Sequence, residues 1–194
     1  MKTLFFIVLI ATTNLFAKDL SFLPKAKKNY VKAVLTKVPS YETEMKKQVM
    51  RYVPVAQNIA HDLHVSPDLV IAVIWIESHF KSEARSKVGA KGLMQIMPKT
   101  RLAMINEMKE FNLIVSKHLS SGLSYQELED MILGAYYLNK LKKRFNNNTE
   151  LAIVAYNMGP TWVSKQISNN NPVGKKNHYL NKVMNKITVI ASAE

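Results

Sequence analysis

The chain has 194 residues, of which 47% are hydrophobic, with only six glycines and seven prolines. This length and composition fit one compact domain with short extensions and exclude gross disorder. The formal net charge is +13, which suits a polyanionic partner, although solubility alone explains it equally well. Because there is no cysteine, disulfides, thiolate metal ligands and lipid-modified cysteines are excluded.

The N-terminus, residues 1–17, has the layout of a secretory signal peptide. Lys2 supplies the positive charge, residues 4–11 form the apolar region, and Ala17 is the small residue before a polar segment. Polar residues 12–14 interrupt the apolar run, which is shorter than the ~20 residues that a membrane span needs. We therefore expect cleavage after Ala17, no stable membrane insertion afterwards, and a periplasmic or secreted protein.

Export also bears on the polyanion that the basic surface would bind. The sequence has no zinc-finger spacing and no RNA-binding signature, so we expect no nucleic-acid partner. Peptidoglycan, whose peptides carry carboxylates, is a polyanion outside the cytoplasm and is the candidate that remains.

Residues 18–40 contain Pro24, Pro39 and a basic cluster but little sustained periodicity; the cluster comprises Lys25, Lys27 and Lys28. This pattern predicts an N-terminal extension, which could dock a cell-envelope assembly partner. We assign residues 41–194 to a single domain.

The domain begins with a helical pattern. Apolar residues spaced by three or four predict a first helix, straight or kinked at Pro54: Met45, Val49, Tyr52, Ala56, Ile59 and Leu63. Ser66 is then a predicted N-cap with Pro67 at the first helical position. The wholly apolar run 69–76 fits a buried strand by periodicity alone, but these capping signals favour a helix buried on all sides. Glu77 lies near its end.

After a predicted loop over residues 86–98, the helical pattern resumes at about Pro98. Ser124 and Glu127 form a capping box for a long helix with an apolar stripe: Leu128, Ile132, Ala135, Leu138, Leu141 and Phe145.

The C-terminal part is also helical. Thr149 is the predicted cap of a further helix, which Gly159 and Pro160 end, and a last helix covers about residues 177–190. Because no strand pairs or repeats emerge, we predict a mostly α, single-domain fold.

Glu77, in the segment W-I-E-S-H-F, places a carboxyl group against an apolar helix. Desolvation raises a carboxyl pKa and keeps the group protonated near neutral pH, where it can act as a general acid. Taken alone the signal is weak, because most glutamates at helix ends are solvated.

Two further segments add to this signal. G-A-K-G-L-M-Q-I-M-P-K-T runs from Gly89 to Thr100, and A-Y-N-M-G-P runs from Ala155 to Pro160. In this order and spacing, the three segments resemble the lytic transglycosylases of the soluble-lytic-transglycosylase type, members of the lysozyme-like superfamily. The resemblance covers about residues 50–185 and implies an α-helical lysozyme-like domain with a glycan-binding cleft.

The resemblance also implies roles for matching residues. The catalytic acid/base falls on Glu77, and the Tyr156 hydroxyl matches a group that can hydrogen-bond the glutamate. The positions that match substrate-binding or cleft-lining residues are Ser78, Met94, Gln95, Tyr156, Asn157 and Tyr179. Two departures concern loop geometry: residues 81–83 stand where an Asn-Pro pair is common, and Asp130 replaces a usual asparagine.

Glycoside cleavage normally uses two carboxylates, and only one is evident here. Candidates for a second match no motif, and we expect them on the solvated surface: Glu83, Glu107, Glu110, Glu127, Glu129 and Asp130. One carboxylate suffices if the muramic acid N-acetyl group assists and the sugar's own 6-hydroxyl closes a 1,6-anhydro ring. His61 and His64 share a helix face but lack a third ligand, so we expect no metal and no cofactor.

Two other hypotheses stay open at this point. One is a hydrolytic muramidase on the same fold, which needs a second carboxylate to hold water. The other is a peptidoglycan-binding protein that opens the wall for a secretion or motility apparatus, with little activity of its own.

Overall fold

The computed structural model describes residues 20, 23–39, 43–174 and 177–191, so the predicted signal peptide, residues 1–17, lies outside the described residues. Over these ranges the chain is helical, without a regular strand, and the prediction of a mostly α fold is confirmed. In chain order the helices are α2 Lys25–Thr36, α3 Thr43–Asp62, α4 Pro67–Ser78, α5 Pro98–Glu107, α6 Phe111–His118, the short 3₁₀ helix η1 Leu119–Ser121, α7 Tyr125–Arg144, α8 Thr149–Met158, α9 Pro160–Ser168 and α10 His178–Ala191.

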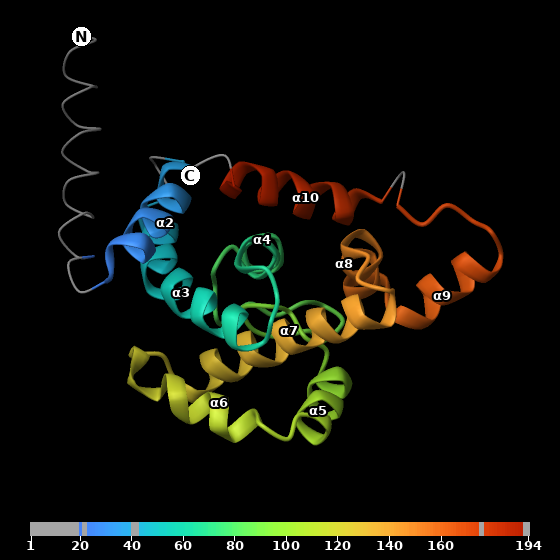
Figure 1. Cartoon of the computed structure of the whole chain (residues 1–194), viewed down its shortest axis with the longest axis horizontal. Coiled ribbons are helices and arrows are strands. Elements are labelled where there is room, and N and C mark those ends of the chain that lie inside the picture. The colour runs from blue at the N-terminus through green and yellow to red at the C-terminus, as the bar shows by residue number, and fades with distance from the viewer. Residues whose placement is uncertain (1–19, 21–22, 40–42, 175–176, 192–194) are drawn as a thin grey trace, which may run out of the picture.

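Helix α4 lies at the centre of the fold. It contacts α3, α7 and α10, and Figure 1 shows α10 crossing over both α4 and α8 along one long side of the molecule. Every side chain from Leu69 to Trp75 is at most 3% exposed, which confirms the prediction of a helix buried on all sides. Ser66 caps it by accepting a hydrogen bond from the Leu69 amide.

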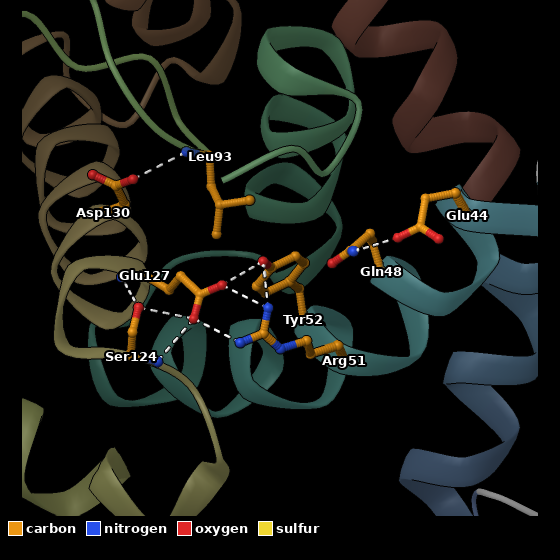
Figure 2. Close-up of polar contacts among 8 residues, drawn as sticks. All are labelled: Glu44, Gln48, Arg51, Tyr52, Leu93, Ser124, Glu127 and Asp130. Atoms are coloured by element: carbon orange, nitrogen blue, oxygen red, sulfur yellow. Dashed lines mark hydrogen bonds and ion pairs between the residues drawn. The ribbon is translucent and has the colours of Figure 1, made fainter. Parts of the chain in front are cut away.

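Helix α7 begins with the predicted capping box between Ser124 and Glu127. The same glutamate also joins α7 to α3, because its carboxylate accepts hydrogen bonds from Arg51 at 2.7 and 2.8 Å and from the Tyr52 hydroxyl at 2.6 Å (Figure 2). The prediction of a solvated Glu127 is therefore wrong: its side chain is 8% exposed. Its charge is balanced by Arg51, which makes burial tolerable.

Helix α2 lies within the segment predicted as an extension. Val31 and Val34 are fully buried, and α2 packs on α3. The Tyr30 hydroxyl hydrogen-bonds Asp68 at the start of α4. A stripe of few valines among lysines is too short to stand out as a periodic pattern, so the helix was not predicted. The domain boundary at residue 40 stays a prediction.

Two smaller predictions need correction at α8 and α9. The N-cap of α8 is Asn148, whose side chain accepts from the Leu151 amide at 3.0 Å, and Thr149 is the first helical residue. Gly159 ends α8 as predicted, with φ +86°, but Pro160 starts α9 because proline is well suited to the first position of a helix.

Among the described helices, none is both long and apolar enough to cross a membrane.

Candidate active site

Glu77 lies in the last turn of α4, and the chain turns sharply after it. His79 and Phe80 both have positive φ, +51° and +61°, and Phe80 is fully buried against the Trp75 ring. Such left-handed residues cost conformational energy, which the packing of Phe80 offsets. The turn fixes the end of α4 and leaves Glu77 half-buried.

Two half-buried tyrosines from later helices approach this carboxyl group. The Tyr179 hydroxyl, on α10, donates a 2.6 Å hydrogen bond to Glu77 Oε1. Tyr156, on α8, is close enough for the charge of Glu77 to raise its pKa further above the level set by burial. Burial and the same charge also hold the pKa of Tyr179 well above its ordinary value, so both phenols stay protonated.

The protonation of Glu77 is set by two opposing effects. Burial raises its pKa above the ordinary value, and the hydrogen bond donated by Tyr179 works in the lowering direction because it stabilises the carboxylate. The balance favours a raised pKa. The site therefore holds a carboxyl group that keeps its proton to a higher pH than an ordinary glutamate does, as a general acid must.

The loop before α5 is tied to this site and to α7. The Tyr156 hydroxyl donates to the Met94 carbonyl at 2.8 Å, and the Leu93 amide donates to Asp130 Oδ2 at 3.1 Å (Figure 2). The Gln95 side-chain amide donates to the Ala84 and Gly92 carbonyls, both at 2.9 Å. These bonds fix the loop from three sides.

Glycines at two positions allow the close packing of this loop. A Cβ on Gly92, where φ is +82°, would lie 1.6 Å from Asp130 Oδ2. A Cβ on Gly134, in α7, would lie 2.2 Å from Met94 Sδ. Close approach of the backbone therefore requires glycine at both positions.

Several residues predicted from the sequence are brought together here, and others are placed differently. Glu77, Tyr156 and Tyr179 converge, but it is Tyr179 and not Tyr156 that hydrogen-bonds the glutamate. The Met94 side chain is fully buried against α7, so the prediction of a cleft-lining side chain is wrong, and only its carbonyl contacts the site.

The remaining predicted residues border the site in different ways. Ser78 is buried, and its hydroxyl donates to the Ile74 carbonyl of its own helix at 3.0 Å. Gln95 is half-buried with φ +48°, and Asn157 is exposed near the end of α8. As placed, Ser78 stabilises the end of α4, whereas Asn157 has the exposure that a substrate contact needs.

Asp130 is a buried residue that joins α7 to the loop before α5, a role that was not predicted for it. It was expected on the surface, yet it is 1% exposed and forms an ion pair with Arg101, which also bonds Glu129 at 2.6 Å. Burial raises the pKa of Asp130 despite the ion pair and the bond from the Leu93 amide. A signal was present in the sequence, because Asp130 lies among the apolar residues of the α7 stripe.

The prediction of a solvated Glu129 is also wrong, because its side chain is 13% exposed and forms an ion pair with Arg101. The three other candidate carboxylates lie at the surface. Glu83 and Glu110 are exposed, and Glu107 pairs with Lys140. Among the described residues, no hydrogen bond joins Glu77 to a second carboxylate. In the same part of the chain, no group of three His, Cys, Asp or Glu side chains could hold a metal ion.

This helical fold is that of solved lytic transglycosylases. It is similar to the 70 kDa soluble lytic transglycosylase of Escherichia coli, with a TM-score of 0.50 and 22% identity over 73% of this chain and 22% of that one. It is also similar to the lytic transglycosylase Slt of Pseudomonas aeruginosa, solved as an inactive mutant, with a TM-score of 0.52 and 24% identity over 95% and 28% of the two chains.

Sequence comparison places the chain more narrowly. Residues 54–179 match the family model of the transglycosylase SLT domain, so the chain belongs to that family. Soluble lytic murein transglycosylases of Salmonella typhimurium and Escherichia coli K12 are 32% identical over 103 residues and 33% identical over 97 residues. These matches cover 51% and 48% of this chain but only 15% and 14% of the relatives, so the matched part spans about a seventh of their length.

Proposed function

We propose that the protein is an exported lytic transglycosylase that cleaves the bond between N-acetylmuramic acid and N-acetylglucosamine in peptidoglycan without water. One observation carries the proposal. Glu77 is a half-buried carboxyl group with a raised pKa, and it is hydrogen-bonded by a phenol, not by a second carboxylate. Membership of the transglycosylase SLT domain family supports the substrate class.

The proposed reaction uses Glu77 twice. As an acid it gives its proton to the glycosidic oxygen, the bond from that oxygen to muramic C1 breaks, and the muramic N-acetyl group stabilises the cation at C1. As a carboxylate it then accepts the proton of the muramic 6-hydroxyl while that oxygen bonds to C1. The products are a new N-acetylglucosamine end and a 1,6-anhydromuramoyl end, and Glu77 is protonated again.

The neighbouring groups support both steps. Tyr179 can hold one carboxyl oxygen of Glu77 and leave the other toward the sugar. Its protonated phenol stabilises the carboxylate formed after the first step, so the group is strong enough as an acid and still weakly basic afterwards. We propose that Gln95 and Asn157 contact the glycan, because Gln95 is half-buried in the loop that Tyr156 contacts and Asn157 is exposed and follows Tyr156 in the chain.

The test is mass spectrometry of muropeptides that the purified protein releases from isolated peptidoglycan. We expect anhydromuramoyl products, lighter by one water than hydrolytic ones. Glu77→Gln should reduce release by about 10²- to 10⁴-fold and retain binding, since acid catalysis is worth that much. Glu110→Gln, which removes an exposed carboxylate by the same change, should leave release unaltered. Reducing-end products would instead indicate a muramidase.

We also propose export through residues 1–17 and docking of an assembly partner through residues 18–40. Deleting that segment would uncover α3, because Val31 and Val34 of α2 are buried. The sharper variant reverses the charge of exposed Lys25 and Lys32. This charge reversal should reduce the fraction of the protein that co-localises with the assembly partner, without changing the rate of peptidoglycan cleavage. An unchanged fraction would refute the docking proposal.

A further inference from the structure

A cavity of about 260 Å³ lies beside the loop of the active site, between residues 82–98 and helices α5 and α7. Its charged lining comprises Glu83, Arg85, Lys91, Arg101 and Asp130. Arg101 is already neutralised by Asp130 and Glu129, so it serves as part of the wall. The cations that remain for a ligand are Arg85 and Lys91, with Glu83 as the one other charged group.

Arg85 and Lys91 face each other across an antiparallel bridge. The two flanking hydrogen bonds run from the Gly92 amide to the Ala84 carbonyl at 2.9 Å and from the Ser86 amide to the Ala90 carbonyl at 3.0 Å. Residues 85 and 91 are therefore a non-hydrogen-bonded pair, the arrangement that brings opposite side chains closest, with Cα atoms about 4.5 Å apart. Both side chains project on the same face of the ribbon.

Like charges directly opposite each other destabilise a strand pair unless an anion lies between them. Both residues are exposed, and within the described part of the chain neither forms an ion pair with a carboxylate. The backbone that carries them is held in place by the Gln95 side chain and by the tight turn at Ser86–Gly89. A preorganised pair of cations without an anion between them is suited to bind a carboxylate.

We propose that this cavity binds a carboxylate of the peptide stem attached to the muramic acid that occupies the active site. The proposal rests on the function proposed above and adds a subsite to it. Gly92 and Ile96 line the cavity, while Met94 between them contacts Tyr156 of the active site. Two residues span at most about 7 Å of chain, and three residues of an extended stem span about 10 Å, so a stem is long enough to cover this separation along the loop.

The double variant Arg85→Gln, Lys91→Gln tests the subsite, with Lys87→Gln as the matched control. Lys87 is exposed on the same ribbon but does not line the cavity. Two substrates are compared: glycan strands with their stems, and the same strands after an amidase has removed the stems. We expect the double variant to raise KM about tenfold on stem-bearing strands only, because charge-assisted hydrogen bonds are lost. Lys87→Gln should change neither substrate.

Equal changes on both substrates, or an equal effect of Lys87→Gln, would overturn the proposal, since they would show a general effect of surface charge. A direct titration of the purified protein with the free stem tripeptide, followed by NMR, needs no catalysis. The double variant should bind this peptide about tenfold more weakly, and conversion of the peptide's carboxylates to carboxamides should abolish the difference. Absence of cleavage by the wild-type protein would refute the proposed function, whereas absence of tripeptide binding would refute only the subsite.

Discussion

The hydrogen bond from Tyr179 to Glu77 gives a quantitative prediction about the acid. Tyr179→Phe removes the hydroxyl and keeps the ring that buries the carboxyl group. The 2.6 Å bond stabilises the carboxylate, and hydrogen bonds to charged groups contribute about 1.5–3 kcal/mol. Since one pKa unit corresponds to about 1.4 kcal/mol, we expect the Glu77 pKa to rise by about one unit or somewhat more.

The assay is a titration of the Glu77 side-chain carboxyl by ¹³C NMR, with Glu77→Gln used to assign the signal. Tyr137→Phe is the control. This half-buried tyrosine packs on the Tyr156 ring, with ring centroids 5.4 Å apart, and does not hydrogen-bond Glu77. The control should leave the Glu77 pKa unchanged. If Glu77 must be protonated for the first step, the alkaline limb of kcat/KM should move upward with the NMR pKa.

A Glu77 pKa that stays the same or falls in Tyr179→Phe would refute this reasoning. An unchanged value would mean that the phenol does not distinguish the two protonation states, and a lower value would mean that it stabilises the neutral acid.

Other predictions concern stability. Glu77→Gln should raise the free energy of unfolding at pH 7 relative to wild type, because the raised pKa of Glu77 in the folded state makes its ionised form destabilising. This difference should disappear below the carboxyl pKa of the unfolded state, which urea titrations at several pH values measure. Burial opposes ionisation of Glu127, but the hydrogen bonds from Tyr52 and Ser124 and the charge of Arg51 outweigh burial and lower its pKa. The free energy of unfolding should therefore fall as the pH drops below the ordinary carboxyl pKa. Glu127→Gln should cost about 2 kcal/mol at pH 7 and flatten that decline; an unchanged slope would contradict the assignment. Gly92→Ala should destabilise far more than Gly122→Ala, since φ is positive at both but a methyl group collides only at Gly92; equal losses of about 1 kcal/mol would show that the loop yields.

Periodicity and capping residues predicted most of the helices. Ser66 and the Ser124–Glu127 box mark helix starts because they satisfy amides within their own turn, a local effect that sequence carries. Helices α2 and α9 were missed for opposite reasons. The apolar stripe of α2 is short, and Pro160 was interpreted as a stop although it starts a helix.

The site divides in the same way. Glu77 stood out because a carboxyl group at the end of an apolar helix is a local pattern, and the resemblance of three sequence segments then implied its catalytic role. That Tyr179 and not Tyr156 hydrogen-bonds Glu77 depends on how α10 packs on α4 and α8, which spacing along the chain does not encode. The burial of Asp130 and Glu127 likewise depends on partners 29 and 76 residues away, Arg101 and Arg51.

In the proposed mechanism Glu77 serves as both acid and base, and water does not enter the reaction. Digestion of purified peptidoglycan in H₂¹⁸O, followed by mass spectrometry of the newly formed muramoyl ends, tests it most directly. The proposed mechanism predicts anhydromuramoyl ends without ¹⁸O from the wild-type protein and no such ends from Glu77→Gln. Reducing ends that carry ¹⁸O at C1 would contradict it and would require a second group that holds water.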